Sequence, residues 1–241
     1  CLKLFQKFTH PGMYSKSAGA RPDREESAVP VVGLADADAF RRSIDPIVEA
    51  GKLGALLVQF PPSFRYGGDT REYLDWLLQA FPGYPVAVEL RHRSWSDHQP
   101  AVLELLKAHR AAWVQIDEPK FRFSISQSHL PNLGSLYYMR LHGRNAEKWW
   151  THDHPDERYN YLYSPAEIEG FADTVSRVRA LVQRIYVFMN NHFAGKAVAN
   201  AAALRHAIGQ PVPGEYAEEM LSRYPFLRRI VERPGAGTLF D

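Results

Sequence analysis

The stretch ALLVQFPPSFRYGGDTREYLDWLLQAFPGYPVAVELR, residues 55–91, carries the pattern that decides the fold. Residues 55–60 and 86–90 are short β-rich runs bounded by turn residues, a pattern typical of strands. Between them, residues 70–80 place apolar side chains at helical spacing. A strand, a helix and a second strand in this order predict a βα unit in a parallel sheet.

The same alternation continues through the rest of the chain. Further strands are expected at 1–5, 112–117, 136–141 and 185–190, and further helices at 38–50, 99–109, 165–182 and 196–208. This order predicts an α/β protein with a parallel (β/α) barrel of the TIM type, a fold for which about 250 residues suffice. A doubly wound open sheet is the alternative, but its Gly-rich phosphate turn does not follow the first strand.

The chain opens inside a strand-like run, so we expect the first two β/α units of the barrel to be lacking from this sequence. Residues 1–208 are then predicted to supply strands three to eight of the barrel. Residues 209–241 are predicted to form a C-terminal extension packed on it, with one helix at 215–224. The link at 118–135 shows no convincing helix and is expected to be an irregular crossover.

Several residues suit the ends of the predicted helices. Asp69, Asp97 and Ser164 can each cap an N-terminus, and Pro165 fits the first helical position. Gly51 and Gly209 suit the C-terminal ends.

Composition restricts the class of protein. The 241 residues are 45% hydrophobic, which is enough for a sizeable core, and 29 Lys and Arg nearly balance 27 Asp and Glu. No overall field therefore recruits nucleic acid or an anionic membrane. No apolar run approaches the roughly 20 residues that span a bilayer. The single cysteine, Cys1, rules out an intrachain disulfide framework and suits a reducing, cytoplasmic location.

Polar side chains stand at the carboxyl ends of the predicted strands, where parallel barrels place their catalytic groups. They are Lys3, Gln59, Glu89, Arg91, Asp117, Arg140, His142, Asn190, Asn191 and His192. Because side chains two apart on a strand share a face, Glu89 and Arg91 are expected on one face of their strand, and so are Arg140 and His142. We expect a common polar pocket. The alternative is a structural ion pair inside the barrel, such as Glu89 with Arg140.

Four segments resemble motifs of one family. They are LLVQFPPSF at 56–64, AVELRHRSW at 87–95, YMRLHGR at 138–144 and YVFMNNHFAG at 186–195. Together they resemble the YecE-like family, also called domain of unknown function 72, over about residues 1–208. The opening LKLFQKFTH is similar to the third-strand segment of that family, which supplies a lysine and a Thr-His pair, here Lys3 with Thr9 and His10. The resemblance implies a TIM-type barrel and the absence of the first two strands, but no established reaction.

Two groups of side chains suggest chemistry. Arg91, Arg140 and Arg144, with Lys3, suit a phosphate or carboxylate, because guanidinium groups bind such oxyanions in bidentate fashion. Gly195 and Lys196 begin a helix after the last strand, where barrels often bind phosphate. The alternative is that Gly195 only permits a tight turn.

Glu89, Asp117 and His142 are the candidates for general acid–base catalysis. The same mixed set of carboxylates and imidazole is also able to hold a divalent metal, but the neighbouring arginines would repel a dication, so no cofactor is predicted. In the loop after residue 144, the triplet His152, Asp153 and His154 is interpreted as solvated surface, and Trp149 and Trp150 as part of a lid or a docking patch.

These observations predict an enzyme, a hydrolase or an isomerase, that acts by acid–base chemistry on a small anionic polar ligand. The alternative is a non-catalytic barrel that binds a metabolite or a protein, because the sequence has no decisive nucleophile, metal motif or cofactor fingerprint. Nucleic-acid processing is disfavoured by the near-neutral charge. The sequence leaves the oligomeric state open.

Overall fold

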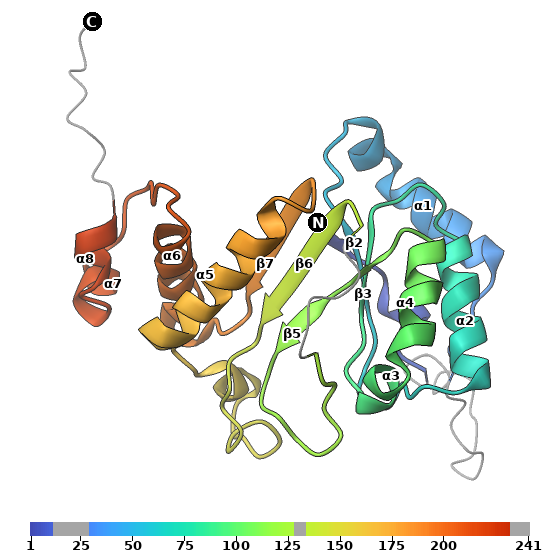
Figure 1. Ribbon diagram of the computed structural model, residues 1–241, viewed down its shortest axis with the longest axis horizontal. Helices are drawn as coiled ribbons and strands as arrows, with labels where there is room; N and C mark the ends of the chain where they lie inside the picture. The colour runs from blue at the N-terminus through green and yellow to red at the C-terminus, as the bar shows by residue number, and fades with distance from the viewer. Residues whose placement is uncertain (12–28, 128–133, 232–241) are drawn as a thin grey trace, which may run out of the picture. The chain divides into compact units, whose positions relative to one another are not determined.

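The computed structural model describes residues 1–11, 29–127 and 134–231, and it is a mixed α/β structure (Figure 1). The chain divides into two compact units. The N-terminal unit comprises Cys1–Gln115 and Phe121–Tyr138, and the C-terminal unit comprises Ile116–Lys120 and Met139–Asp241. Each unit is described by itself below.

The N-terminal unit contains a four-stranded parallel sheet in the order β1-β2-β3-β4. Its strands are β1 (Leu2–Lys3), β2 (Leu56–Gln59), β3 (Val86–Glu89) and β4 (Ala112–Trp113). The helices between them are η1 (Gln6–Phe8), α1 (Leu34–Glu49), α2 (Gly68–Gln79), α3 (Arg93–Asp97) and α4 (Gln99–Ala108). The predicted βα alternation and parallel strand direction are therefore confirmed here.

The central strands of this sheet are apolar on both faces. Leu56, Val58, Val86 and Val88 on one face and Leu57 and Ala87 on the other are all buried, as expected for parallel strands covered on both sides. After β2, the ring of Phe60 stacks on that of Phe64 with centroids 3.9 Å apart. The indole of Trp95 stacks on Phe64 in turn, and its Nε1–H donates to the Phe64 carbonyl at 2.8 Å. This aromatic stack anchors the segments that follow β2 and β3.

A second sheet has three strands in the order β5-β6-β7. They are β5 (Gln115–Asp117), β6 (Leu136–Leu141) and β7 (Arg184–Met189). The following helices are η3 (Pro155–Tyr159), α5 (Pro165–Arg179), η4 (Phe193–Gly195), α6 (Lys196–Ala207), α7 (Glu218–Arg223) and α8 (Leu227–Ile230). Both α5 and α6 contact β7.

Backbone hydrogen bonds join the carboxyl ends of these three strands. The His142 N–H donates to the Asp117 carbonyl at 2.8 Å, and the Asn190 N–H donates to the Leu141 carbonyl at 2.7 Å. Only strands that run in the same direction bring their carboxyl ends together in this way. The second sheet is therefore also parallel at this end.

The structure shows two sheets rather than one closed barrel. The predicted strand at 112–117 is divided into β4 and β5, which belong to different sheets. Among the described strands, neither sheet closes on itself. The parallel α/β class is thus confirmed, while closure into a TIM-type barrel stays a prediction.

Helix ends follow the predictions in part. Ser164 caps α5, and its Oγ accepts from the Glu167 N–H while Pro165 takes the first position. Gly51 and Gly209 have left-handed φ values of 65° and 70° after α1 and α6. The predicted caps Asp69 and Asp97 are wrong. Gly67 precedes α2 and His98 precedes α4, so that the two carboxylates lie in the first turn of α2 and the last turn of α3.

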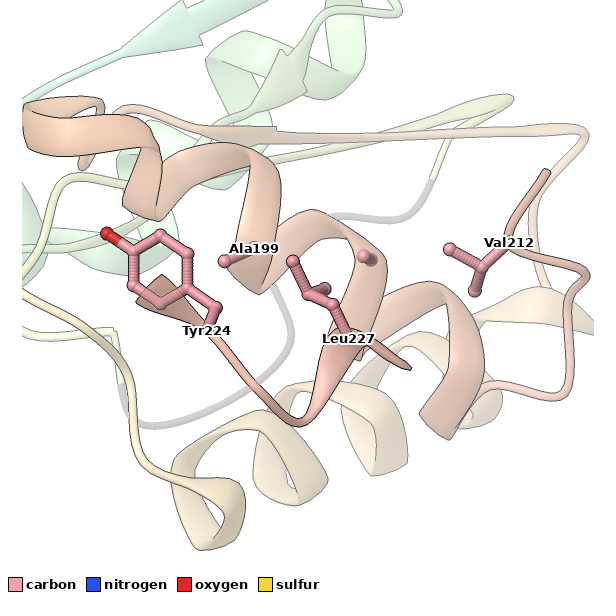
Figure 2. Close-up of a cluster of buried hydrophobic side chains, with 5 residues drawn as sticks. Ala199, Val212, Tyr224 and Leu227 are labelled. Atoms are coloured by element: carbon pink, nitrogen blue, oxygen red, sulfur yellow. The ribbon is translucent and has the colours of Figure 1, made fainter. Parts of the chain in front are cut away.

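The C-terminal segment packs on α6. Val212, Tyr224 and Leu227 bury their side chains against Ala199 and Ala202, both on α6 (Figure 2). The helix predicted at 215–224 is α7, which is shorter than expected. The domain boundary predicted at residue 208 stays a prediction, and residues 232–241 of the predicted extension lie outside the described residues. No helix in the described ranges has the length and apolarity needed to cross a membrane.

Candidate functional site

Strand register places three of the predicted site residues on one face of the first sheet. Lys3 pairs with Leu57, and Gln59 pairs with Glu89. Because Leu57 and Gln59 are two apart on β2, Lys3, Gln59 and Glu89 all point to the same side. Lys3 is exposed, Gln59 is partly exposed and Glu89 is buried, so this polar row leads from solvent into the unit.

Glu89 is fully buried and carries an ion pair. Its side chain is 0% exposed, and Arg91 Nε donates to Glu89 Oε1 at 2.7 Å. A buried carboxylate is tolerated only with such compensation, because the desolvation of an unpaired charge costs several kcal/mol. Two of the predicted site residues are therefore brought together, and Arg91 stabilises the ionised form of its partner.

His10 joins this group. Burial, followed by the positive charges of Lys3 and Arg91, lowers the pKa of His10 below its ordinary value of 6.5. Thr9 Oγ1 lies 2.8 Å from His10 Nδ1 and fixes the orientation of the ring. The strand-end pattern did not select His10, because it follows the short helix η1 rather than a strand. The Thr-His pair in the opening segment was the signal that marked it.

In the second sheet, register separates the predicted site residues onto two faces. In the first sheet, the hydrogen bond from the Leu4 N–H to the Leu57 carbonyl accompanies the pairing of Lys3 with Leu57. The hydrogen bond from the His142 N–H to the Asp117 carbonyl follows the same pattern, so it pairs Leu141 with Asp117. The Asn190 to Leu141 bond likewise pairs Leu141 with Met189. The positions one residue further along are Glu118, His142 and Asn190, and they therefore lie together on the opposite face.

Asp117 points toward α5 and is bound by Arg144. Arg144 Nε and Nη2 donate to the two carboxylate oxygens of Asp117 at 2.9 and 2.8 Å, and Arg144 Nη1 donates to Glu167 Oε1 at 2.7 Å. The hydrogen bond and charge of Asp117, with the charge of Glu167, raise the pKa of Arg144 above its ordinary value. This guanidinium already holds two carboxylates, so the geometry favours a structural role for Asp117 and Arg144.

Tyr163 completes this network. Its hydroxyl donates to Asp117 Oδ2 at 2.8 Å and accepts from the Gly143 N–H at 2.8 Å. Burial, together with the charge of Asp117, raises the pKa of Tyr163 well above 10. Gly143 has φ 88°, and a Cβ there would lie 2.7 Å from Tyr161 Cβ. The glycine of the YMRLHGR segment is therefore required by the backbone and by close packing.

The two asparagines after β7 also point in opposite directions. Asn191 is 0% exposed, and its Nδ2 donates to the Tyr161 carbonyl at 2.8 Å and to Asn200 Oδ1 on α6 at 2.7 Å. Asn191 thus fastens the end of β7 to α6. Asn190 lies on the other face, together with His142. Arg140, which is two residues before His142 on β6, lies on that face as well.

Gly195 occupies a tight left-handed turn. It has φ 80°, the preceding Ala194 has φ 53°, and a Cβ on Gly195 would lie 2.7 Å from Met220 Sδ. The next residue, Lys196, hydrogen-bonds to Asn160, and burial lowers the pKa of its ammonium group. Conformation and packing account for the glycine, while phosphate binding at this turn stays a prediction.

The side chains considered for other roles lie in the loop after Arg144. His152 Nδ1 lies 3.1 Å from the Lys148 carbonyl. Trp149 is buried, whereas Trp150 is 59% exposed. In the part of the chain that the structure describes, no group of three His, Cys, Asp or Glu side chains is arranged to hold a metal ion.

Comparisons with known proteins place these features in a family. The family model described as "Protein of unknown function DUF72" matches residues 1–221. The UPF0759 protein YunF of Bacillus subtilis is 29% identical over 176 residues, which are 68% of this chain and 60% of that relative, so the chain spans less than two thirds of its length.

Solved structures agree with this match. A DUF72 family protein from Thermotoga maritima has a TM-score of 0.72 and 32% identity over 86% of this chain and 72% of its own. A DUF72 family protein from Enterococcus faecalis has a TM-score of 0.69 and 27% identity over 78% of this chain and 69% of its own. Because the family model matches well over half of the chain and the solved relatives share its α/β architecture, this chain belongs to the DUF72 family of proteins of unknown function.

Proposed function

We propose that this protein is an enzyme that binds a small polar metabolite carrying a phosphate or carboxylate group and acts on it by acid–base chemistry, as a hydrolase or an isomerase. One observation carries the proposal. In each sheet, polar strand-end side chains share one face, Lys3, Gln59 and Glu89 in the first and Arg140, His142 and Asn190 in the second. Charged groups gathered in this way at the ends of parallel strands are typical of ligand sites.

Lys3 and Arg91 are the proposed anion-binding groups of the N-terminal unit. Both are close enough to His10 to lower its pKa, so their positive charges act on the same space. The lowered pKa favours the neutral imidazole of His10 near pH 7, and a neutral imidazole can accept a proton from a ligand and become a cation. Glu89 remains the proposed acid–base group of the N-terminal unit and His142 that of the C-terminal unit, whereas Asp117 and Arg144 are left out because they hold each other.

The proposed fold is a closed (β/α) barrel of the TIM type. The alternation of parallel strands and helices supports it, as does membership of the family. A crystal structure in which β1 to β7 belong to one continuous curved sheet would support the barrel. Two separate sheets in such a structure would contradict it.

Isothermal titration calorimetry with inorganic phosphate and a panel of sugar phosphates tests the anion-binding role. We expect Lys3→Ala and Arg140→Ala each to weaken binding by about tenfold or more, because a charge-assisted hydrogen bond contributes about 1.5–3 kcal/mol. Lys52→Ala, which removes an exposed lysine outside the polar row, is the matched control and should bind like the unaltered protein. Unchanged affinity in both Lys3→Ala and Arg140→Ala would remove the anion-binding role.

A second candidate function is non-catalytic binding of a metabolite. It is favoured by the ion pairs of Glu89 with Arg91 and of Asp117 with Arg144, which engage both carboxylates predicted to be catalytic. A turnover screen of a metabolite library on the whole protein separates the two functions. Consumption of a compound that is lost in Glu89→Gln favours the enzyme, and binding without consumption favours the binding protein.

A further inference from the structure

His10 lies at the end of a segment that is firmly held in the N-terminal unit. Thr9 is 0% exposed, and the Tyr73 hydroxyl on α2 donates to the Phe8 carbonyl at 2.6 Å, which fastens the short helix η1 to α2. His10 follows directly and is partly exposed. The backbone of His10 is therefore fixed, while part of its side chain reaches solvent.

The hydrogen bond between Thr9 and His10 decides which nitrogen of the ring carries the proton. Thr9 Oγ1 lies 2.8 Å from His10 Nδ1 and 3.5 Å from the Gln6 carbonyl oxygen. That carbonyl already accepts the backbone N–H groups of Thr9 and His10 at 3.0 and 2.9 Å. The Thr9 hydroxyl therefore donates to Nδ1, the nearer and less occupied acceptor, and the proton of the neutral ring lies on Nε2.

Nε2 of His10 is the atom through which the ring can meet a ligand. Among the described residues, Nε2 has no hydrogen-bond partner, and it is not one of the side-chain atoms that are both buried and unpaired, so solvent reaches it. A neutral imidazole accepts a proton only through its bare nitrogen, and here that nitrogen, Nδ1, is covered by Thr9. Toward a ligand, His10 consequently acts as a hydrogen-bond donor.

Positive charges act on this donor. Burial, followed by the charges of Lys3 at the end of β1 and Arg91 after β3, lowers the pKa of His10 and so favours its neutral form near pH 7. The same field that disfavours a second proton on the ring favours an anion beside it. An oxyanion bound at Nε2 gains from both charges without displacing the ion pair of Arg91 with Glu89.

We propose that His10 is a ligand-binding residue whose Nε2–H donates to the phosphate or carboxylate group of the ligand, and that Thr9 is the residue that positions it. This inference rests on the proposed function and adds a neutral donor to the two cations Lys3 and Arg91. It assigns His10 to binding rather than to proton acceptance, and it leaves proton transfer in the N-terminal unit to Glu89. The ligand group at this place must offer acceptors, as an ionised phosphate or carboxylate does.

The position of the ring proton is tested without a ligand. Two-bond ¹H–¹⁵N correlation spectra of the ¹⁵N-labelled whole protein at pH 8 report which ring nitrogen is protonated, and the His10 signals are assigned by their loss in His10→Gln. We expect the proton on Nε2. Thr9→Val, which lacks the hydroxyl, should shift the Nδ1 signal, and Thr9→Ser, which retains it, should shift that signal much less. A proton on Nδ1 would overturn the donor role of His10 and leave the proposed anion binding intact.

Binding is tested with inorganic phosphate. Saturating phosphate should raise the NMR titration midpoint of His10, because a bound anion offsets the charges of Lys3 and Arg91. In calorimetry, His10→Phe should weaken phosphate binding about tenfold or more, the usual effect of losing one hydrogen bond to a charged group. His10→Gln, whose amide nitrogen can take the place of Nε2, should lose less. His206→Phe replaces an exposed histidine on α6 and is the matched control, which should bind like the unaltered protein.

The outcomes separate this inference from the proposed function. Unchanged phosphate affinity in His10→Phe, or a midpoint that saturating phosphate does not move, overturns the role of His10, whereas the proposed function stands if Lys3→Ala still weakens binding. If neither phosphate nor sugar phosphates bind the unaltered protein, both proposals fail. If His10→Phe does not fold, the midpoint of His10 in the unaltered protein decides the question.

Discussion

Asp117 and Arg144 face each other in a bidentate ion pair, with Arg144 Nη2 2.8 Å from Asp117 Oδ1 and Arg144 Nε 2.9 Å from Asp117 Oδ2. The guanidinium lies over the rings of Tyr163 and Phe171 at 6.0 Å from each centroid. The pair thus joins the end of β5 to α5 through Glu167. Two residues that sequence reasoning assigned to catalysis and to substrate binding are positioned to stabilise the fold.

Arg144→Ala is therefore expected to reduce the free energy of unfolding. The variant loses charge-assisted hydrogen bonds to Asp117 and Glu167, and because the arginine is partly exposed we expect a loss of about 1–2 kcal/mol. Urea denaturation measures it. Arg93→Ala, which breaks an exposed pair with Asp97, should lose less than about 0.5 kcal/mol. Equal effects in the two variants would contradict the structural role.

Removal of Arg91 is expected to destabilise the protein more strongly. Arg91→Ala removes the ion pair that Arg91 forms with the buried carboxylate of Glu89, and the loss of one partner of a buried ion pair typically costs about 3–5 kcal/mol. The double variant Arg91→Ala with Glu89→Gln should recover part of that loss, because the amide carries no charge. Chemical denaturation of the single and double variants tests this. A double variant that is less stable than Arg91→Ala alone would show that Glu89 does not depend on Arg91.

His10 is expected to make stability depend on pH. Its pKa is lowered in the folded protein, so between that pKa and the ordinary value of 6.5 the unfolded chain binds more protons than the folded one. Its contribution to stability is therefore complete above pH 6.5 and is lost as the pH falls through the lowered pKa. We expect a smaller decrease in unfolding free energy between pH 7.5 and 5.5 in His10→Gln than in the unaltered protein.

His92 also contributes to the pH dependence of stability, because burial and the charge of Arg65 lower its pKa. His92 is present in both the unaltered protein and His10→Gln, so the difference between their pH dependences isolates the contribution of His10. Lys3→Ala removes one of the charges that lower the pKa of His10, and an NMR titration of the imidazole should then give a higher midpoint. A midpoint that does not move would show that Lys3 does not act on His10.

The turn after β7 depends on the C-terminal segment. The Tyr224 hydroxyl donates to the Ala194 carbonyl at 2.8 Å, and Met220 packs against Gly195. We expect Tyr224→Phe to lose about 1 kcal/mol of unfolding free energy, the usual contribution of one hydrogen bond. Gly195→Ala should lose about 1–2 kcal/mol or more, because its left-handed backbone disfavours a Cβ and Met220 fills the space.

Thermal unfolding followed by circular dichroism checks both variants. The double variant Gly195→Ala with Met220→Ala separates the two causes. If it is no more stable than the sum of the two single changes predicts, close packing does not contribute and backbone strain accounts for the effect.

The sequence alone determined the order of strands and helices, the parallel α/β class and the family. These features depend on local periodicity and on contiguous motifs, which each segment carries by itself. The six strand-like runs all became strands, and Ser164 with Pro165 began α5 as predicted. The proximity of Glu89 and Arg91 could also be predicted from the sequence, because residues two apart in an extended segment share a face.

Only the tertiary structure decided which of two adjacent polar residues lies on the same face of the sheet as His142. Asp117 and Glu118, like Asn190 and Asn191, alternate across a sheet, and a shift of one residue exchanges the faces. Register with β6 and contacts with α5 and α6 turned Asp117 and Asn191 toward the helices, and left Glu118 and Asn190 beside His142. Those contacts join residues far apart in the chain, so local sequence pattern carries no record of them.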